Sequence, residues 1–471
     1  MKGLARALAA SIPLIVSSEV QAATLDGAAL TWPFALPFAG LLLSIAVWPL
    51  LFPKIWHAHY GKIAAGWSIL TLALLAWFGG VTLVSAAFVH AMLAEYLSFI
   101  VLLFALYTVA GGILVSGDIR GTPYNNTVML AFGTAIASIV GTTGAAMILI
   151  RPLIRANISR QHNTHVVIFF IILVANVGGA LSPLGDPPLF VGFLHGVNFF
   201  WTTRHLLPQT AVVGGLLLAM FCAFDIWRYR AEPASVLIEP GASIRIRGLI
   251  NLPLIAAIIA VILISASWRP DIAIDILGTR LELQNLTRDT ALLLIALLSL
   301  WLTPDEHREA NGFTWEPIRE VAKLFAAIFT TIIPVLAALD AGRKGFFAWL
   351  LSAVTERDGT PHEVAYFWYT GVISAFLDNA PTYLLFFKLA GGDAHVLMNE
   401  YAGTLAAISM GAVYMGALTY IGNAPNFMVA AIATEQGIKM PSFFGYLFWA
   451  SVILIPMFLL LTLLPFAPVL K

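Results

Sequence analysis

Residues 179–190 read Gly-Ala-Leu-Ser-Pro-Leu-Gly-Asp-Pro-Pro-Leu-Phe and interrupt a long apolar run. Three prolines in this stretch remove backbone donors, and Gly185 frees the backbone dihedral φ, so a helix is expected to unwind here and leave carbonyl groups without partners. Asp186 adds a carboxylate in a segment that is long enough to cross a membrane, where a charge costs roughly 2.5–3.5 kcal/mol. The stretch therefore predicts a broken transmembrane helix that carries a functional charge.

The same stretch recurs in the second half of the chain. Residues 416–427 read Gly-Ala-Leu-Thr-Tyr-Ile-Gly-Asn-Ala-Pro-Asn-Phe, 237 positions later (416 − 179), and share the pattern G-A-L-[ST]-x-[LI]-G-[DN]-x-P-x-F. Within one residue of the same offset, residues 138–143 align with residues 374–379. The shared residues are polar or helix-breaking, which membrane composition does not favour, so chance similarity is the weaker explanation. Such a repeat, with halves predicted to run in opposite directions, is typical of inverted-topology transporters.

Composition places the whole chain in a membrane. Of its 471 residues, 60% are hydrophobic and 11% are charged, against roughly 45–50% and about 25% in soluble domains. Two apolar stretches, 127–150 and 364–390, contain polar tips and are predicted to be re-entrant hairpins. Other apolar stretches of about 20 residues predict ten crossings: 31–52, 63–89, 94–116, 165–193, 206–226, 249–267, 287–303, 318–340, 401–430 and 443–466.

These features predict an all-α integral membrane protein with about ten transmembrane helices and two re-entrant hairpins, in two inverted repeats whose broken helices meet at the midplane. Basic residues in short loops favour the cytoplasm. Those predicted inside in the first half include Arg120, Arg151, Arg155, Arg160, Arg228, Arg230, Arg245 and Arg247. The expected location is the inner (plasma) membrane of a bacterial-type cell, as a multi-pass protein.

Four divisions of the chain are predicted. They are a signal peptide or N-terminal helix at 1–22, a first repeat with an extra N-terminal helix at 23–227, a central linker with one transmembrane helix at 228–286, and a second, inverted repeat at 287–471.

Several classes of function lack support in the sequence. Basic and acidic residues number 25 each, so there is no net field that would attract nucleic acid. Cys222 is the single cysteine and can form neither an internal disulfide nor a cysteine-based zinc site. The sequence shows no phosphate-binding loop and no nucleophile triad, so neither an enzyme nor a primary pump is expected. The expected partners are membrane lipid and small ions or a small carboxylate, with Na⁺ and H⁺ as transported or coupling ions and no cofactor.

Oxygen-rich side chains at the breaks and hairpin tips suit hard cations. Either Asp186 or Asp378 could instead cap the half-helix that follows it. His162 and His165 are expected to be solvated loop residues, with sensing of cytoplasmic pH as the alternative. Among the candidates, those for Na⁺ are Asp186, Asp378, Asn379 and Asn423. The full set of candidates for binding an ion or substrate is Thr142, Thr143, Ser182, Gly185, Asp186, Asp378, Asn379, Thr382, Thr419 and Asn423.

Two segments carry a family resemblance. Residues 374–382 read S-A-F-L-D-N-A-P-T and residues 178–188 read G-G-A-L-S-P-L-G-D-P-P. Both resemble signatures of the ion transporter superfamily, which contains NhaD-type sodium/proton antiporters, arsenite permeases and sodium-coupled citrate or dicarboxylate carriers. The resemblance covers about residues 60–466 and includes proteins catalogued as citrate transporters. It implies alternating access, cation binding at the tips and broken helices, and a scaffold that often forms a homodimer.

Two intramembrane carboxylates with no lysine or arginine at either break favour Na⁺(Li⁺)/H⁺ antiport, in which the cation and protons compete for the aspartates. The alternative is a Na⁺-coupled citrate or dicarboxylate symporter, in which Thr142, Thr143, Asn379 and Thr382 hold the anion. Arsenite-type metalloid efflux is a third reading. The equivalence of positions 186 and 423 also predicts that Asn423→Asp is tolerated better than Asn423→Leu.

Overall fold

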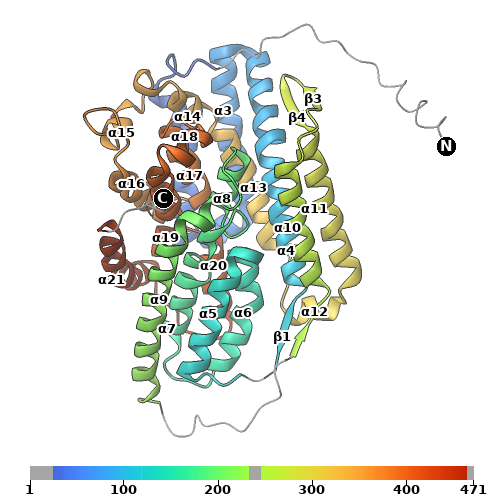
Figure 1. The fold of residues 1–471 in the computed structure, drawn as a ribbon, viewed down its shortest axis with the longest axis vertical. Coiled ribbons are helices and arrows are strands. Elements are labelled where there is room, and N and C mark those ends of the chain that lie inside the picture. The colour runs from blue at the N-terminus through green and yellow to red at the C-terminus, as the bar shows by residue number, and fades with distance from the viewer. Residues whose placement is uncertain (1–24, 118, 233–244, 464–471) are drawn as a thin grey trace, which may run out of the picture.

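Helices follow one another along almost the whole described chain (Figure 1). The computed structural model describes residues 25–117, 119–232 and 245–463. The predicted N-terminal segment 1–22 lies outside them. The first half contains η1 (Trp32–Ala35), α2 (Leu36–Leu51), α3 (Pro53–His90), η2 (Ala91–Tyr96), α4 (Leu97–Gly111), β1 (Leu114–Ser116), α5 (Pro123–Val140), α6 (Thr142–Asn157), α7 (Thr164–Leu173), η3 (Val177–Leu181), α8 (Pro187–Leu194) and α9 (Trp201–Tyr229).

The second half continues after a central segment of one helix and three strands. That segment holds β2 (Arg245–Arg247), α10 (Asn251–Ser267), β3 (Ala273–Ile276) and β4 (Thr279–Glu282). The remaining elements are α11 (Leu283–Leu302), α12 (Asp305–Ala310), α13 (Glu316–Thr331), α14 (Ile333–Asp340), η5 (Gly342–Lys344), α15 (Ala348–Ala353), α16 (Glu363–Phe376), α17 (Asn379–Leu389), α18 (Ala394–Asn399), α19 (Ala402–Met415), η6 (Gly416–Leu418), α20 (Ala424–Glu435) and α21 (Phe443–Thr462).

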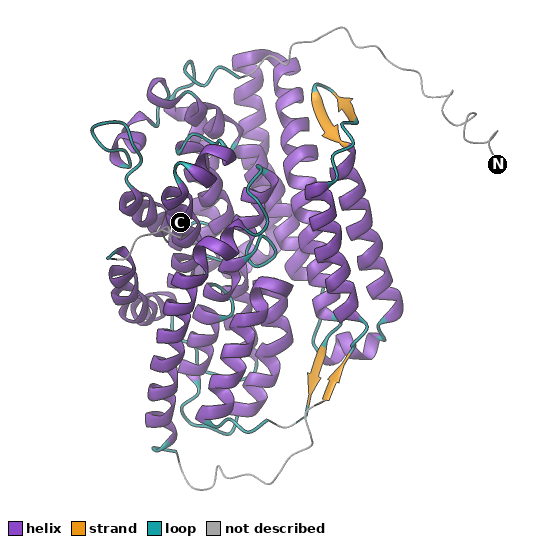
Figure 2. Ribbon diagram, viewed as in Figure 1, coloured by secondary structure: helices purple, strands orange, loops and turns teal. Residues whose placement is uncertain are grey.

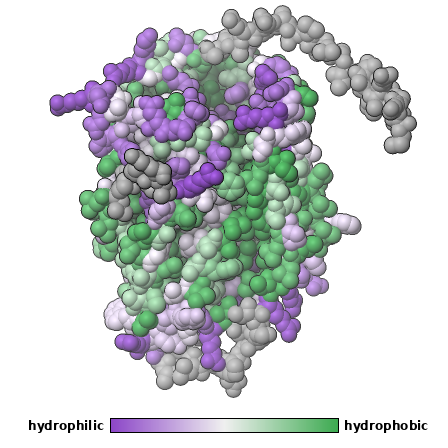
Figure 3. Space-filling model, in the orientation of Figure 1, coloured by the Kyte–Doolittle hydropathy of each residue, from purple (hydrophilic) through white to green (hydrophobic). Residues whose placement is uncertain are grey.

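The prediction of an all-α membrane protein is confirmed. The strands of the described chain form only two short antiparallel pairs, β1 with β2 and β3 with β4 (Figure 2). By length and composition, six helical segments of the described residues could cross a membrane, or seven if the bent pair α13 and α14 is one span. Figure 3 shows the face of the protein that is turned to the viewer in Figure 1. Hydrophobic residues cover the middle of this face and hydrophilic residues lie towards its two ends, as expected for a protein surrounded by lipid.

Some predicted spans differ in detail from the helices. A boundary between two helices was expected between residues 89 and 94, but it lies at Gly80, where two helices meet within α3. The chain is helical between residues 89 and 94, and the non-helical residue is Gly80, whose φ of 79° is open to glycine at little steric cost. Residues 114–116, predicted as the end of a span, form strand β1 instead. They are extended because they pair with residues 245–247 in β2.

Four helix breaks lie inside the predicted interrupted segments. α5 meets α6 at Gly141, whose φ of 82° and ψ of 150° end the helix, and α16 meets α17 at Leu377 and Asp378. α7 is separated from α8 by residues 174–186, and α19 with η6 is separated from α20 by residues 419–423. In Figure 1 the α5–α6 hairpin lies in the lower half of the molecule and the α16–α17 hairpin in the upper half. Their direction relative to a bilayer stays a prediction.

The helices beside the breaks lie at the centre of the protein. Nearly every residue of α7 and of α19 is buried. A surrounding layer of helices therefore separates the unwound backbone from the outside of the bundle, which is the condition for tolerating irregular backbone at membrane depth. The sequence stretches that read as broken helices are thus placed where their exposed carbonyl and amide groups can contact one another across the two halves.

Candidate ion-binding site

The two helix breaks are built alike. The hydroxyl of Ser182 donates to the carbonyl of Ser138, and the hydroxyl of Thr419 donates to the carbonyl of Ala375. Each hydroxyl also accepts from the backbone amide two residues later, at 3.1 Å in the first break and 3.2 Å in the second. Ser182 and Thr419 are therefore occupied in shaping the backbone. Neither is among the described residues that line the cavity near the breaks.

A glycine is required at the same place in each break. A Cβ atom on Gly185 would lie 2.2 Å from the carbonyl oxygen of Gly179, and one on Gly422 would lie 2.5 Å from that of Gly416. These distances are too short for any side chain, because Cβ atoms in proteins essentially never come within 3.0 Å of such a neighbour. The glycines let the chain fold back on itself, so that the next residue of each break, Asp186 or Asn423, faces the other half of the protein.

Asp186 is the polar centre of the site. Its side chain is only 1% exposed and accepts three hydrogen bonds. The hydroxyl of Thr142 donates to Oδ1 at 3.1 Å, Nδ2 of Asn423 donates to Oδ1 at 2.9 Å, and Nδ2 of Asn379 donates to Oδ2 at 2.6 Å. These donors come from one hairpin tip, the opposite break and the other hairpin tip. Residues far apart in the sequence thus converge on one carboxylate, and every donor is electrically neutral.

The two aspartates differ in whether they cap the half-helix that follows them. Both occupy the residue before a half-helix, but the side chain of Asp186 makes no capping hydrogen bond to α8. Asp378 does cap α17, because its Oδ1 accepts from the amide of Ala380 at 3.1 Å. The hydroxyl of Thr382 donates to the backbone carbonyl of Asp378 at 3.0 Å and belongs to the same local structure. Capping therefore accounts for one oxygen of Asp378 and for none of the contacts of Asp186.

Acceptors outnumber donors around Asp186. Oδ1 of Asn379 is buried and has no hydrogen-bond partner. The Asn423 amide nitrogen carries two hydrogens, yet it lies near three acceptors: the carbonyl of Ala175 at 3.0 Å, Oδ1 of Asn176 at 3.3 Å and Oδ1 of Asp186 at 2.9 Å. A buried group of oxygens that is short of hydrogen-bond donors is a suitable environment for a hard cation.

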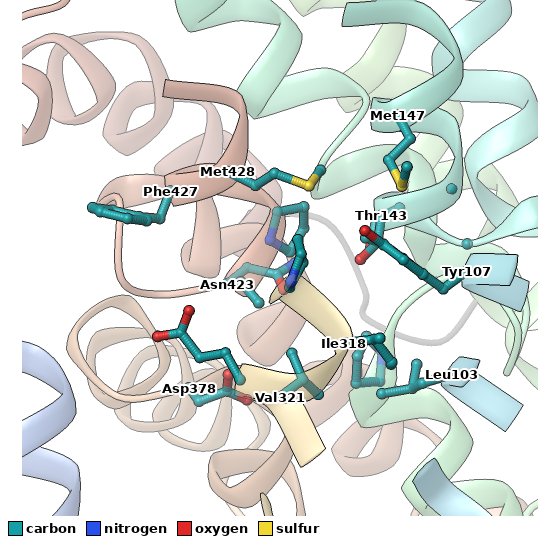
Figure 4. A pocket seen from close by; sticks show the side chains of 18 of the residues that line it. Leu103, Tyr107, Thr143, Met147, Ile318, Val321, Asp378, Asn423, Phe427 and Met428 are labelled. Carbon is teal, nitrogen blue, oxygen red and sulfur yellow. The ribbon is translucent and has the colours of Figure 1, made fainter. Parts of the chain in front are cut away.

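A cavity of about 460 Å³ lies against the two breaks and the tips. In Figure 4 Asn423 lies between Asp378 on one side and Thr143 on the other. Asp186 lies directly behind the cavity wall, because its neighbours Gly185 and Pro187 and its partner Asn423 all line the cavity. Among the described residues, the charged lining groups are the carboxylates of Glu316, Glu320, Asp378 and Glu435 and the guanidinium of Arg151. This excess of negative charge favours cations in the cavity.

One end of the cavity is closed by a thin apolar layer. Phe325 and Ile328 of α13 line the cavity, and they also line a much smaller apolar pocket that extends to α8 and α17. Both side chains are buried, and the ring of Phe325 stacks on that of Phe99 with centroids 4.6 Å apart. Two side chains thus separate the large cavity from the small pocket.

Three important residues were missed by the sequence analysis. Asn176 and Asn426 are buried between the two breaks and hydrogen-bond to each other. Asn176 is a polar residue inside an apolar run, and that isolated polarity is the signal that could have identified it. Arg151 was predicted to lie in an inner loop, but it is on α6 and lines the cavity. The prediction placed the end of the hairpin too early, because α6 continues to Asn157.

Comparison with known proteins gives two findings. A family model described as "Putative citrate transport" matches residues 27–466. Two similar proteins are an uncharacterized transporter of Mycobacterium bovis and an uncharacterized transporter of Mycobacterium tuberculosis. Each is 25% identical over 329 residues, which cover 68% of this chain and 71% of the relative.

Proposed function

This chain belongs to the family described as "Putative citrate transport", and from that premise we propose that it exchanges Na⁺ or Li⁺ for H⁺ across a bacterial-type inner membrane. Its family and its multiple apolar helices make it a multi-pass secondary transporter. The family description leaves the cargo open between cation and carboxylate, and the charge of the site is the reason for choosing the cation.

The observation that carries the proposal is the environment of Asp186. Its carboxylate is buried and held only by the neutral groups of Thr142, Asn379 and Asn423. No Lys, Arg or His side chain among the described residues forms an ion pair with it. A buried charge is costly unless it is compensated. Either a bound cation or a bound proton compensates it, and the unpartnered Oδ1 of Asn379 supplies a further ligand for the cation.

Exchange follows if the cation and the proton cannot occupy the site together. A cation needs the ionised carboxylate of Asp186 as a ligand, and protonation removes that charge. Binding of one therefore expels the other, and each crossing of the membrane carries either Na⁺ or H⁺. Asp378 offers a second carboxylate at the cavity wall for the approaching ion, because only one of its oxygens is engaged in capping α17.

The test is Na⁺-driven proton movement in everted vesicles that contain the full chain, with ²²Na⁺ and ¹⁴C-citrate fluxes measured in proteoliposomes in parallel. We expect wild type to exchange both Na⁺ and Li⁺ for H⁺, and Asp378→Asn to slow the exchange strongly. Asp393→Asn is the matched control. Asp393 also caps a helix, α18, but it is exposed and does not line the cavity. Absence of cation-driven proton movement in wild type would refute the proposal.

A second candidate function is Na⁺-coupled uptake of a small carboxylate. Arg151 favours it, because this guanidinium lines the cavity and its one hydrogen bond within the described residues is to the carbonyl of Gly312, at 3.3 Å. The cavity volume also lies in the range of about 300–1,000 Å³ that is usual for small-molecule sites. Accumulation of ¹⁴C-citrate that depends on a Na⁺ gradient and is lost in Arg151→Gln would establish this alternative.

A further inference from the structure

Three buried asparagines connect the two helix breaks in one chain of hydrogen bonds that ends at Asp186. Nδ2 of Asn426 donates to the carbonyls of Gly416 and Thr419, both at 2.9 Å. Nδ2 of Asn176 donates to Oδ1 of Asn426 at 2.7 Å and to the carbonyl of Ile171 at 2.8 Å. Oδ1 of Asn176 in turn accepts from Nδ2 of Asn423, which also donates to Asp186.

The chain has a fixed direction. Backbone carbonyls can only accept, so the amide nitrogen of Asn426 must face Gly416 and Thr419, and its oxygen must face Asn176. Asn176 then points its nitrogen towards Asn426 and its oxygen towards Asn423. The nitrogen of Asn423 therefore faces inward. Its oxygen is left on the side of the cavity, whose wall includes Asn423 (Figure 4).

Asp186 alone cannot keep that orientation throughout transport. An ionised Asp186 accepts from the amide nitrogen of Asn423. A protonated Asp186 is also a donor, so it could bond to the amide oxygen of Asn423 equally well and let the amide turn over. Oδ1 of Asn176 is an acceptor in both protonation states, because its own nitrogen remains bound to Asn426. Together with the carbonyl of Ala175, which accepts from the same nitrogen at 3.0 Å, it therefore opposes the turn when Asp186 carries a proton.

We propose that Asn176 is a positioning residue for cation binding: it keeps the oxygen of the Asn423 amide directed at the cavity, where that oxygen is a ligand for the ion. This inference rests on the proposed function. Asn176 does not touch the ion itself, because it is fully buried, uses both ends of its amide within the protein, and is absent from the described lining of the cavity. Its effect must therefore pass through Asn423.

The experiment measures binding of ²²Na⁺ to the purified full-length protein, with competition by protons, in wild type, Asn176→Leu, Asn423→Ala and the double variant. Asn176→Leu removes three buried hydrogen bonds, and loss of the one to Asn423 is expected to weaken Na⁺ binding about tenfold. Asn423→Ala should weaken it further, and the double variant should bind no more weakly than Asn423→Ala alone, because a positioning residue has no effect once its target is gone.

The matched control is Asn251→Leu. Asn251 is also fully buried and fully hydrogen-bonded, to Gly248, Ser299 and Thr303, but lies outside both breaks. It should leave the affinity for Na⁺ unchanged even where it lowers the yield of folded protein. If the losses of Na⁺ affinity add up in the double variant, or if Asn251→Leu causes an equal loss, the role of Asn176 is refuted and the proposed function still stands. Absence of proton-competed Na⁺ binding in wild type would overturn the proposed function together with this inference.

Discussion

The hairpin formed by α5 and α6 contacts a buried aspartate at each end, and the two aspartates differ in the charge of their partners. At the tip, Asp186 accepts only from neutral groups, one of them Thr142 of the hairpin. At the base, Asp225 is fully buried and is bound by the guanidinium of Arg160, by Nε2 of His165 at 2.8 Å and by Nδ2 of Asn126 at 2.9 Å.

The difference shows how burial of a charge can serve either structure or transport. Arg160 compensates Asp225 permanently, and the pair joins the loop after α6 to α9, while His165 joins α7 to the same carboxylate. The base is further closed by reciprocal amide bonds between Asn126 and Asn157, at 2.9 and 2.8 Å. Asp186 has no such partner among the described residues, so its compensation must come from outside. A base with an internal ion pair and a tip without a charged partner are the arrangement on which the proposed exchange of cation and proton depends.

Asp186→Asn tests the tip and is expected to have the largest effect. The change preserves shape but fixes neutrality, so Na⁺ loses its charged ligand and the site loses its exchangeable proton. We expect Na⁺-driven proton movement to fall at least about a hundredfold, equivalent to a loss of about 3 kcal/mol, with unchanged membrane insertion. Exchange in everted vesicles at matched expression is the measurement. A wild-type rate in this variant would show that the two ends of the hairpin do not differ in function.

Asp225→Asn tests the base. It removes the charge that pairs with the buried Arg160 and leaves only Glu232, whose Oε1 lies 3.9 Å from Nε of Arg160. Removing one partner of a buried ion pair typically costs about 3–5 kcal/mol of stability. We expect a lower unfolding temperature and a lower yield of detergent-purified protein, whereas the molecules that fold should keep the wild-type affinity for Na⁺. Thermal unfolding and ²²Na⁺ binding on the same preparation distinguish the two effects. Normal stability combined with lost Na⁺ binding would reverse the assignment of the two aspartates.

Asn423→Asp sharpens the comparison at the tip. The repeat predicts that aspartate is tolerated better than leucine at this position. Asn423 donates to Asp186, however, and a second carboxylate there would lose the donor and repel the first. The two carboxylates of the variant resemble the native pair of Asp186 and Asn423 only while they share one proton. Acidic pH favours that state. We expect exchange near the wild-type rate at acidic pH and about a tenfold loss as pH rises, with Asn423→Leu slow throughout. Identical pH profiles for the two variants would contradict this expectation.

His165→Gln is expected to have the smallest effect. Arg160 and Asn126 remain bound to Asp225, so only one contact of the base is lost, at about 1 kcal/mol. The dependence of exchange on pH should stay as in wild type. A shifted pH profile in this variant would instead support the alternative drawn from the sequence, in which the histidine senses cytoplasmic pH, and would give the base of the hairpin a regulatory role.

Local chemistry explains what the sequence could predict. Pro187 and Pro188 cannot continue a helix that comes before them but can begin a new one, as they do in α8, and Gly185 weakens a helix, so this break could be predicted from residue types. Packing between distant segments could not. His165 was expected to be solvated, yet it is buried, because α9 brings Asp225 against it. The kink at Gly80 was missed because a glycine permits a positive φ without requiring one, so its residue type alone does not locate a kink.

The hydroxyl groups show the same limit within the site. Thr142 and Ser182 look equivalent as ligands in the sequence, but only Thr142 reaches Asp186, while Ser182 is bonded to the backbone of Ser138. Which hydroxyl serves the backbone depends on the path of the chain after it unwinds. Residue type therefore predicted the region of the candidate site, whereas the contacts formed on folding determine which hydroxyl reaches Asp186.

The thin layer formed by Phe325 and Ile328 has an electrical consequence. Where water fills the cavity from one side of the membrane, it carries the potential of that side as far as these two side chains, so the voltage falls over less than the hydrocarbon thickness of about 30 Å. An ion that crosses the whole membrane still gains or loses about 2.3 kcal/mol per 100 mV. Most of that electrical work is then done in the part of the protein that begins at Phe325 and Ile328.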